Sequence, residues 1–135
     1  MNREVLRMLR LSIGVLGFAI MLAPNSSWSE EVPDALSVEW HGKKLCENLY
    51  EDSMMRILWC TLEPGDVHVR HSHPALFGYV LKGAGGKGQV VDEKGTRTFD
   101  EDPDGEHWTS GPNAWHEVTN IGNTTLSYLI VEKKY

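Results

Sequence analysis

Two histidines stand two residues apart in the stretch GDVHVRHSHPALFGYVLKG, residues 65–83. The run around His71 and His73 is typical of a β-strand, on which successive side chains alternate between the two faces. The two imidazoles therefore share one face, and the backbone brings their nitrogens near one point. A neutral imidazole is a good ligand for zinc, iron, nickel or copper. Alone, the pair fits a metal site and a pair of hydrogen-bonded or exposed histidines equally well.

The alternation also assigns the neighbours of this pair. Val67 and Val69 fall on the face of the two histidines, which suggests an apolar interior that becomes polar at its mouth. His68 falls on the other face, so we expect it to lie on the solvent side and not to bind a ligand.

A second stretch, GEHWTSGPNAWHEVTN at residues 105–120, delivers a third imidazole. It reads as a strand, a Gly-Pro-Asn turn and a returning strand that carries His116. Three histidines are sufficient for a catalytic metal site, whose open positions take water or substrate. We predict a metal site made of His71, His73 and His116.

Short β-type runs must position these residues. They follow one another closely, separated by turns rich in Gly, Pro, Asn and Asp, and no helical period extends beyond two turns after residue 29. This pattern predicts an all-β sandwich or barrel of the jelly-roll kind. The expected strands are Lys44–Tyr50, Met54–Leu62, Asp66–His73, Phe77–Lys82, Gly88–Asp92, Thr96–Asp100, Glu106–Ser110, Ala114–Thr119 and Thr125–Glu132.

Together these stretches resemble the two motifs of a small single-domain cupin. In the first motif, Gly65, His71, His73 and Gly83 match, but Leu76 stands where the family has a ligand glutamate, and the spacing after His73 is one residue short. In the second motif the matching residues are Gly105, His116 and Asn120, whereas Gly111 and Asn113 replace the family's proline and glycine around Pro112. The resemblance covers about residues 50–132.

The resemblance implies a double-stranded β-helix, the cupin barrel, at residues 44–135. It also implies a homodimer and one divalent transition metal (Fe, Zn, Ni, Mn or Cu) on the three histidines. Some cupin-like thiol dioxygenases similarly hold iron by three histidines without the carboxylate. A metal-dependent dioxygenase, isomerase or lyase acting on a small organic molecule is then expected. A non-catalytic periplasmic protein that binds a metal or small ligand, and a scaffold without metal, remain as alternatives.

The family pattern also suggests neighbours of the metal. Leu76, Gly78 and Val80 are expected to face inward, with Gly78 leaving open space beside the ion. Tyr79 would donate a hydrogen bond to a ligand. Indole rings would stack on it, or serve core and interface instead; the candidates for stacking are Trp59, Trp108 and Trp115, and those for a dimer interface are Trp40, Trp59 and Trp115.

The N-terminus predicts export. Three arginines, an uncharged apolar run at residues 11–23 and a small-residue exit are the signature of a signal peptide over residues 1–29. The apolar run is shorter than the roughly 20 residues of a membrane-spanning helix, which disfavours the alternative of a permanent anchor. A polar leader, residues 30–43, follows. The expected location is periplasmic or secreted.

Charge excludes some partners. The whole chain carries a net charge of −6, and loss of three arginines and one glutamate with residues 1–29 would make it −8. Such a surface opposes binding to nucleic acid or to anionic lipid. A small-molecule ligand or substrate is the expected partner, with no membrane contact after cleavage.

Two cysteines, Cys46 and Cys60, flank an apparent hairpin in a chain expected outside the reducing cytoplasm. They would lie opposite each other if the hairpin loop has about three residues, and a shift of one residue would place them on opposite faces. A disulfide and two buried thiols both remain open.

Overall fold

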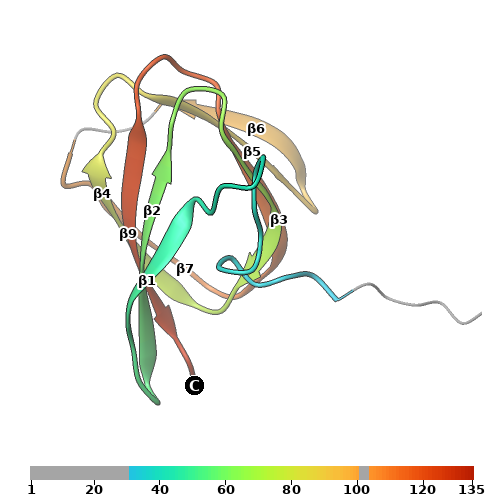
Figure 1. Ribbon diagram of the computed structural model, residues 1–135, viewed down its shortest axis with the longest axis vertical. Coiled ribbons are helices and arrows are strands. Elements are labelled where there is room, and N and C mark those ends of the chain that lie inside the picture. The colour runs from blue at the N-terminus through green and yellow to red at the C-terminus, as the bar shows by residue number, and fades with distance from the viewer. Residues whose placement is uncertain (1–30, 101–103) are drawn as a thin grey trace, which may run out of the picture.

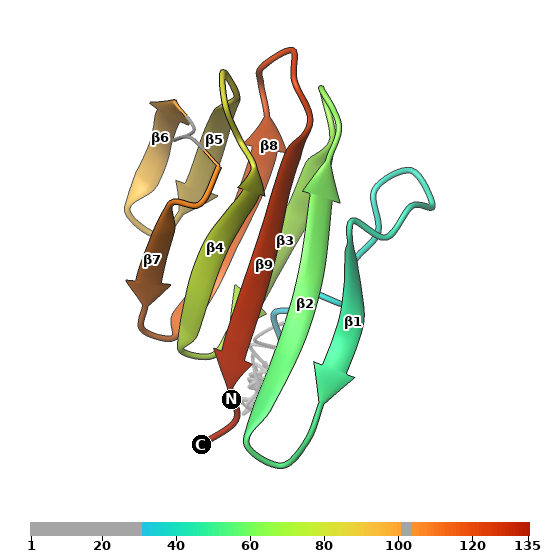
Figure 2. The same cartoon turned by 90° about the vertical axis from the view of Figure 1, so that its left-hand side faces the viewer.

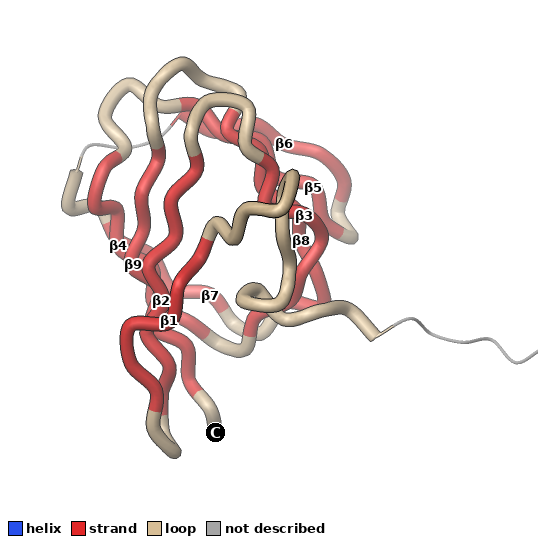
Figure 3. Tube along the Cα trace, viewed as in Figure 1, coloured by secondary structure: helices blue, strands red, loops and turns tan. Residues whose placement is uncertain are grey.

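A computed structural model describes residues 31–100 and 104–135, so the predicted signal peptide lies outside the described residues. All regular elements in these two ranges are β-strands (Figure 3). The described part contains no helix long and apolar enough to cross a membrane.

The nine strands form two antiparallel sheets that face each other (Figures 1 and 2). The larger sheet has the order β1-β2-β9-β4-β7 and the smaller has the order β3-β8-β5-β6. Every predicted strand is present, with ends within two residues of those expected, and the all-β prediction is confirmed. The strands are β1 (Cys46–Glu51), β2 (Met55–Leu62), β3 (Val67–His73), β4 (Leu76–Lys82), β5 (Lys87–Asp92), β6 (Gly95–Asp100), β7 (His107–Ser110), β8 (Asn113–Asn120) and β9 (Leu126–Lys133).

Alternating apolar side chains of the central strands build the core. Leu58 and Leu126 are fully buried, and Val80 is nearly so. Cys46 pairs with Cys60 across β1 and β2, and the two form a disulfide inside this core. The first of the two alternatives for the cysteines is therefore the correct one.

The leader closes one side of the sandwich. Its backbone runs along β3, where Ser72 N–H donates to Pro33 O at 2.9 Å, and it inserts Ala35, only 1% exposed, into the core. The edges of β6 and β7, at the other side of the two sheets, have no such cover among the described residues.

Strand β3 departs from regular alternation. The pairing register with β8 shifts between His68 and His71, which is the signature of a β-bulge. As a result, His68 and His71 both point into the sandwich and are buried, whereas Val67 and Val69 are half-buried. The predicted placement of the valines beside the two histidines, and of His68 on the solvent side, was wrong because the extra residue resets the side-chain period.

Candidate metal centre

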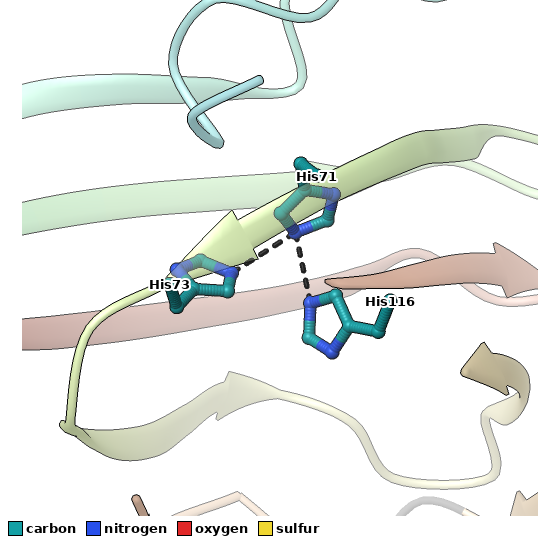
Figure 4. Close-up of side chains that lie close together, drawn as sticks. All are labelled: His71, His73 and His116. Carbon is teal, nitrogen blue, oxygen red and sulfur yellow. Dashed lines mark hydrogen bonds between the residues drawn. The ribbon is translucent and has the colours of Figure 1, made fainter. Parts of the chain in front are cut away.

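The three predicted histidines converge on one point (Figure 4). His71 lies directly opposite His116 in the β3–β8 pairing, and His73 follows two residues along β3. The Nε2 atom of His71 lies 3.0 Å from Nε2 of His73 and 2.8 Å from Nε2 of His116. One ligand atom from each ring lies within 4.8 Å of the other two. This spacing fits three ligands of a single ion.

The outer ring nitrogens fix which tautomers are present. His71 donates its Nδ1–H to the carbonyl oxygen of Val69 at 2.8 Å, and His73 donates its Nδ1–H to Oε1 of Glu132 at 2.5 Å. Since both partners only accept hydrogen bonds, the neutral rings keep their Nε2 lone pairs free. Two lone pairs therefore face each other at 3.0 Å, an arrangement that a cation between them would stabilise.

Burial keeps two of the three rings, those of His71 and His116, uncharged. His71 is fully buried, and this burial, together with the neighbouring imidazoles, holds its pKa well below the ordinary value. Burial, followed by repulsion from His73 and His68, lowers the pKa of His116 to about 3. Because a metal binds the neutral imidazole, both groups are ready ligands at neutral pH.

A carboxylate lies behind the site. Glu132 on β9 is fully buried and pairs in register with Leu76, the position where the cupin pattern has its glutamate. Its Oε1 accepts from His73, so this bond crosses from one sheet to the other. A carboxylate that holds the outer nitrogen of a ligating histidine orients the ring and makes it more basic.

Glu132 is held in turn by a cation. Arg56 on β2 donates from Nε to Oε2 of Glu132 at 2.6 Å, and its other nitrogens bond both carboxylate oxygens of Asp34 in the leader. Burial alone would raise the pKa of Asp34, but bonds from Arg56 and from the Leu36 N–H lower it below its usual range. Leader and metal site are thus joined by one chain of charged hydrogen bonds.

His68 supports the site from another side. Its ring stacks on His71, with centroids 3.7 Å apart, and its Nε2–H donates to Ala35 O at 3.0 Å. Burial lowers the pKa of His68 to about 4. His68 is therefore a neutral packing partner of a candidate ligand.

The histidines line a cavity of about 530 Å³ between the sheets. Its described walls are largely apolar and aromatic, with Trp108 among them. Leu76 and Val80 also line it, as predicted, but Gly78 does not, since the Trp108 ring covers it. The expected open space at Gly78 is therefore filled.

The other proposed pocket residues lie elsewhere. Tyr79 alternates with buried Gly78 and Val80, and it points out of the sandwich with 37% exposure. Trp59 bonds Ser127 Oγ on the outer face of β2, and the Arg70 guanidinium packs over Trp115 at 4.3 Å from the ring centroid. None of these three lines the cavity, because each stands on the outward side of its strand.

Two residues that matter for the site were missed in the sequence. The signal for Glu132 was its parity, since it follows Leu126, Tyr128 and Ile130 on the inward face of β9. A charged side chain on a buried stripe needs a partner, and so marks a site. The bulge that turns His68 inward leaves no comparable signal in VHVRHSH.

Solved structures share this fold at low sequence identity. A cupin domain from Bordetella pertussis superposes with a TM-score of 0.60 at 16% identity, covering 67% of this chain and 92% of that one. A protein from Klebsiella pneumoniae with a double-stranded β-helix domain gives 0.55 at 15%, covering 73% and 84%. A cupin family protein from Methanocaldococcus jannaschii gives 0.54 at 16%, covering 67% and 80%.

No protein-family model and no curated protein match the chain in sequence. The similarity to the solved structures therefore establishes the cupin double-stranded β-helix as the fold of this chain.

Proposed function

We propose that this cupin-fold protein binds one divalent transition metal through His71, His73 and His116 and acts as a metal-dependent enzyme on a small organic molecule. The observation that carries the proposal is the convergence of free Nε2 lone pairs from rings whose Nδ1–H groups are already bonded. Imidazole ligands suit iron, zinc, nickel and copper, and the family resemblance adds manganese as a fifth candidate. When bound, the ion supplies Lewis-acid chemistry at the positions that the histidines leave open.

The residues around the metal have separate tasks in this proposal. Glu132 and the carbonyl oxygen of Val69 orient two of the ligands. Asn113 accepts the His73 backbone N–H at 2.9 Å and so ties β3 to the start of β8. The apolar cavity wall excludes water and receives the organic part of the substrate. Dioxygenase, isomerase and lyase reactions remain the candidate chemistries.

One observation favours a second candidate, a protein that binds a metal or small ligand without turnover. A proton-transferring enzyme needs a free acid or base beside the reacting atoms. Among the described residues, the carboxylate bonded to these histidines is Glu132, and both its oxygens are engaged by His73 and Arg56. Glu106 and His107 also line the cavity, so they are the acid and base candidates that an enzyme would have to use. Turnover of a substrate whose reaction needs no acid or base from the protein would show that the protein is an enzyme and not only a binding protein.

Metal content tests the proposal directly. The untagged protein should carry about one equivalent of a transition metal by elemental mass spectrometry, and His116→Ala should lose it. His41→Asn is the control, because His41 is an exposed histidine outside both the cluster and the cavity, and asparagine tolerates its positive φ. Absence of metal from the wild type, even after reconstitution with each of the five metals, would overturn the metal site. Turnover by loaded wild type in a screen of oxygen, isomerisation and elimination substrates would separate enzyme from binder.

Export to an oxidising compartment is a further part of the proposal. The Cys46–Cys60 disulfide supports it, since such bonds are rare in the cytosol. Cell fractionation of the full-length protein should recover it outside the cytoplasm in a form shortened by about 29 residues. Recovery of the uncleaved chain in the cytoplasm would contradict this part.

A further inference from the structure

Two aromatic rings line the cavity from opposite sheets, at the edge formed by β6 and β7. Trp108 belongs to β7 and Phe99 to β6, the last strands of the larger and the smaller sheet. Figure 2 shows these strands on the same side of the molecule. Both side chains line the cavity that holds the three histidines. A ligand that enters by this edge reaches the two rings before it reaches the metal site.

Each ring is seated over a glycine of the neighbouring strand. Trp108 pairs in register with Gly78, and a Cβ on Gly78 would lie 2.2 Å from the indole. Phe99 pairs with Gly88 in the same way, and a Cβ on Gly88 would lie 2.1 Å from its ring. Any larger residue at either glycine would displace the aromatic ring. The two glycines therefore admit both rings to the cavity wall.

The Trp108 side chain is only partly covered by the protein. The indole packs over Gly78 and meets the ring of Tyr128 edge-on, with centroids 5.8 Å apart, yet Trp108 is still 39% exposed. A flat ring placed against it would bury apolar surface and gain the favourable geometry of aromatic pairs. A saturated ring of similar size would bury area without that second contribution.

The metal end of the cavity favours a negative group. Three neutral imidazoles leave the charge of a divalent ion uncompensated, and Glu132 is engaged by Arg56 and His73. Of the two charged side chains on the described cavity wall, Arg97 is paired with Asp92 and Glu106 is a carboxylate, so the attraction for a negative group comes from the ion. An anionic oxygen donor is the ligand that suits such an ion.

From these observations we propose that the ligand of this cavity is a small aromatic carboxylate. Its ring packs against Trp108 and Phe99, and its carboxylate is directed to the three-histidine site. This inference rests on the proposed metal site, and it adds the ligand class and two specificity-determining residues.

A matched pair of probes separates ring stacking from charge and size. Benzoate and cyclohexanecarboxylate carry the same charge on six-membered carbon rings, but only benzoate is flat and aromatic. With zinc-loaded protein, calorimetric titrations should give benzoate about fivefold tighter binding than cyclohexanecarboxylate. Trp108→Leu and Phe99→Leu should each bring the ratio of the two dissociation constants, cyclohexanecarboxylate over benzoate, toward one. Trp108→Phe should retain most of this preference for benzoate. Trp115→Leu is the control, because its ring lies outside the cavity under Arg70.

The outcomes separate the two proposals. A protein that loads none of the five metals overturns both. A zinc-loaded protein that binds the two acids equally, or binds neither, overturns the ligand class and leaves the metal site standing. Unchanged ratios in both leucine variants, with unfolding midpoints near that of the wild type, overturn the roles of Trp108 and Phe99.

Discussion

Glu132 and His73 illustrate how a metal site is defined by more than its ligands. Glu132 accepts the Nδ1–H of His73 from inside a fully buried position, with Arg56 neutralising its charge. Loss of such a carboxylate typically lowers metal affinity 10- to 100-fold. The bond acts on the ligand ring, so Glu132 is a positioning residue.

We therefore expect Glu132→Gln to weaken zinc binding by about 10- to 100-fold, measured in competition with a chromophoric chelator. Glu117→Gln is the matched control, since it removes the same charge from the residue next to His116. Equal affinities for both variants and the wild type would contradict the assigned role of Glu132. Because the change also leaves Arg56 without part of its pairing, affinity is to be compared only between folded samples.

The buried neutral histidines make stability depend on pH. Burial lowers the pKa of His68 to about 4 and that of His116 to about 3, while the unfolded chain titrates near 6.5. Below pH 6.5 the unfolded state therefore binds more protons than the folded state. The free energy of unfolding is then highest above pH 6.5 and falls as the pH drops toward the folded pKa values.

Urea unfolding of metal-free protein at pH 7.5 and pH 5 measures this effect. His68 alone should account for about 2 kcal/mol of the decrease in the free energy of unfolding between these pH values. His68→Gln should therefore make the free energy of unfolding less dependent on pH, whereas the exposed His107→Gln should not. A wild-type profile with no decrease over this range would refute the assignment of neutral buried rings.

Single residues also show where sequence analysis succeeds and fails. His71, His73 and His116 could be predicted because a two-residue spacing on a strand and a motif at fixed distance both pointed to them. Glu132 lies 59 residues from its partner His73, and its inward parity becomes informative only once β9 is known to face the site. His68 could not be placed, because a bulge moves side chains without altering residue types.

Strands and turns were the most predictable level of the molecule. Short runs between glycine- and proline-rich turns gave all nine strands, since that pattern reflects local backbone preferences. The leader showed no periodicity, and its role comes from contacts far along the chain. Pro33 pairs with β3, and Asp34 reaches Arg56 on β2.

At this scale the disulfide offers a clear test. Cys46 and Cys60 are 14 residues apart and join edge strand β1 to β2. Closing a loop of this length stabilises a fold by about 3 kcal/mol, mainly by restricting the unfolded chain. We expect a reducing agent to lower the free energy of unfolding by about this amount, as measured by urea titration. The double variant Cys46→Ala/Cys60→Ala should be less stable and insensitive to the reductant, and a wild type that is equally insensitive would contradict the prediction.

Across the whole molecule, the two sides of the sandwich differ. The leader covers the edge beside β3, where Asp34 bonds Arg56 and Ala35 accepts a hydrogen bond from His68, the neighbour of the three-histidine cluster. The other side, at β6 and β7, carries the aromatic rings Phe99 and Trp108. This difference between the two sides could not be derived from the sequence. It depends on which strands lie at the edges of each sheet, and the strand pairings that decide this join residues tens of positions apart.

The outer face of the larger sheet carries apolar side chains in register across its three central strands. Trp59, Leu129 and Tyr79 form one row, and the adjoining row is Ile57, Val131 and Phe77. Trp59 is 43% exposed and Tyr79 is 37% exposed. Apolar exposed faces of this kind mark protein–protein contacts. Because the chain is acidic, two copies meet with least repulsion through these two uncharged rows, which Glu47 on β1 borders beside Trp59.

We therefore expect a homodimer with twofold symmetry, in which the same rows of both copies pack together. Light scattering coupled to size exclusion should give twice the chain mass, and Trp59→Glu or Tyr79→Glu should give the monomer, since each would bury a charge in the interface without a partner. Ile121→Glu is the control, because Ile121 is similarly exposed at 42% but lies in the turn after β8. A monomeric wild type at tens of micromolar would refute the dimer, and a dimer that withstands both glutamate variants would move its interface to another face.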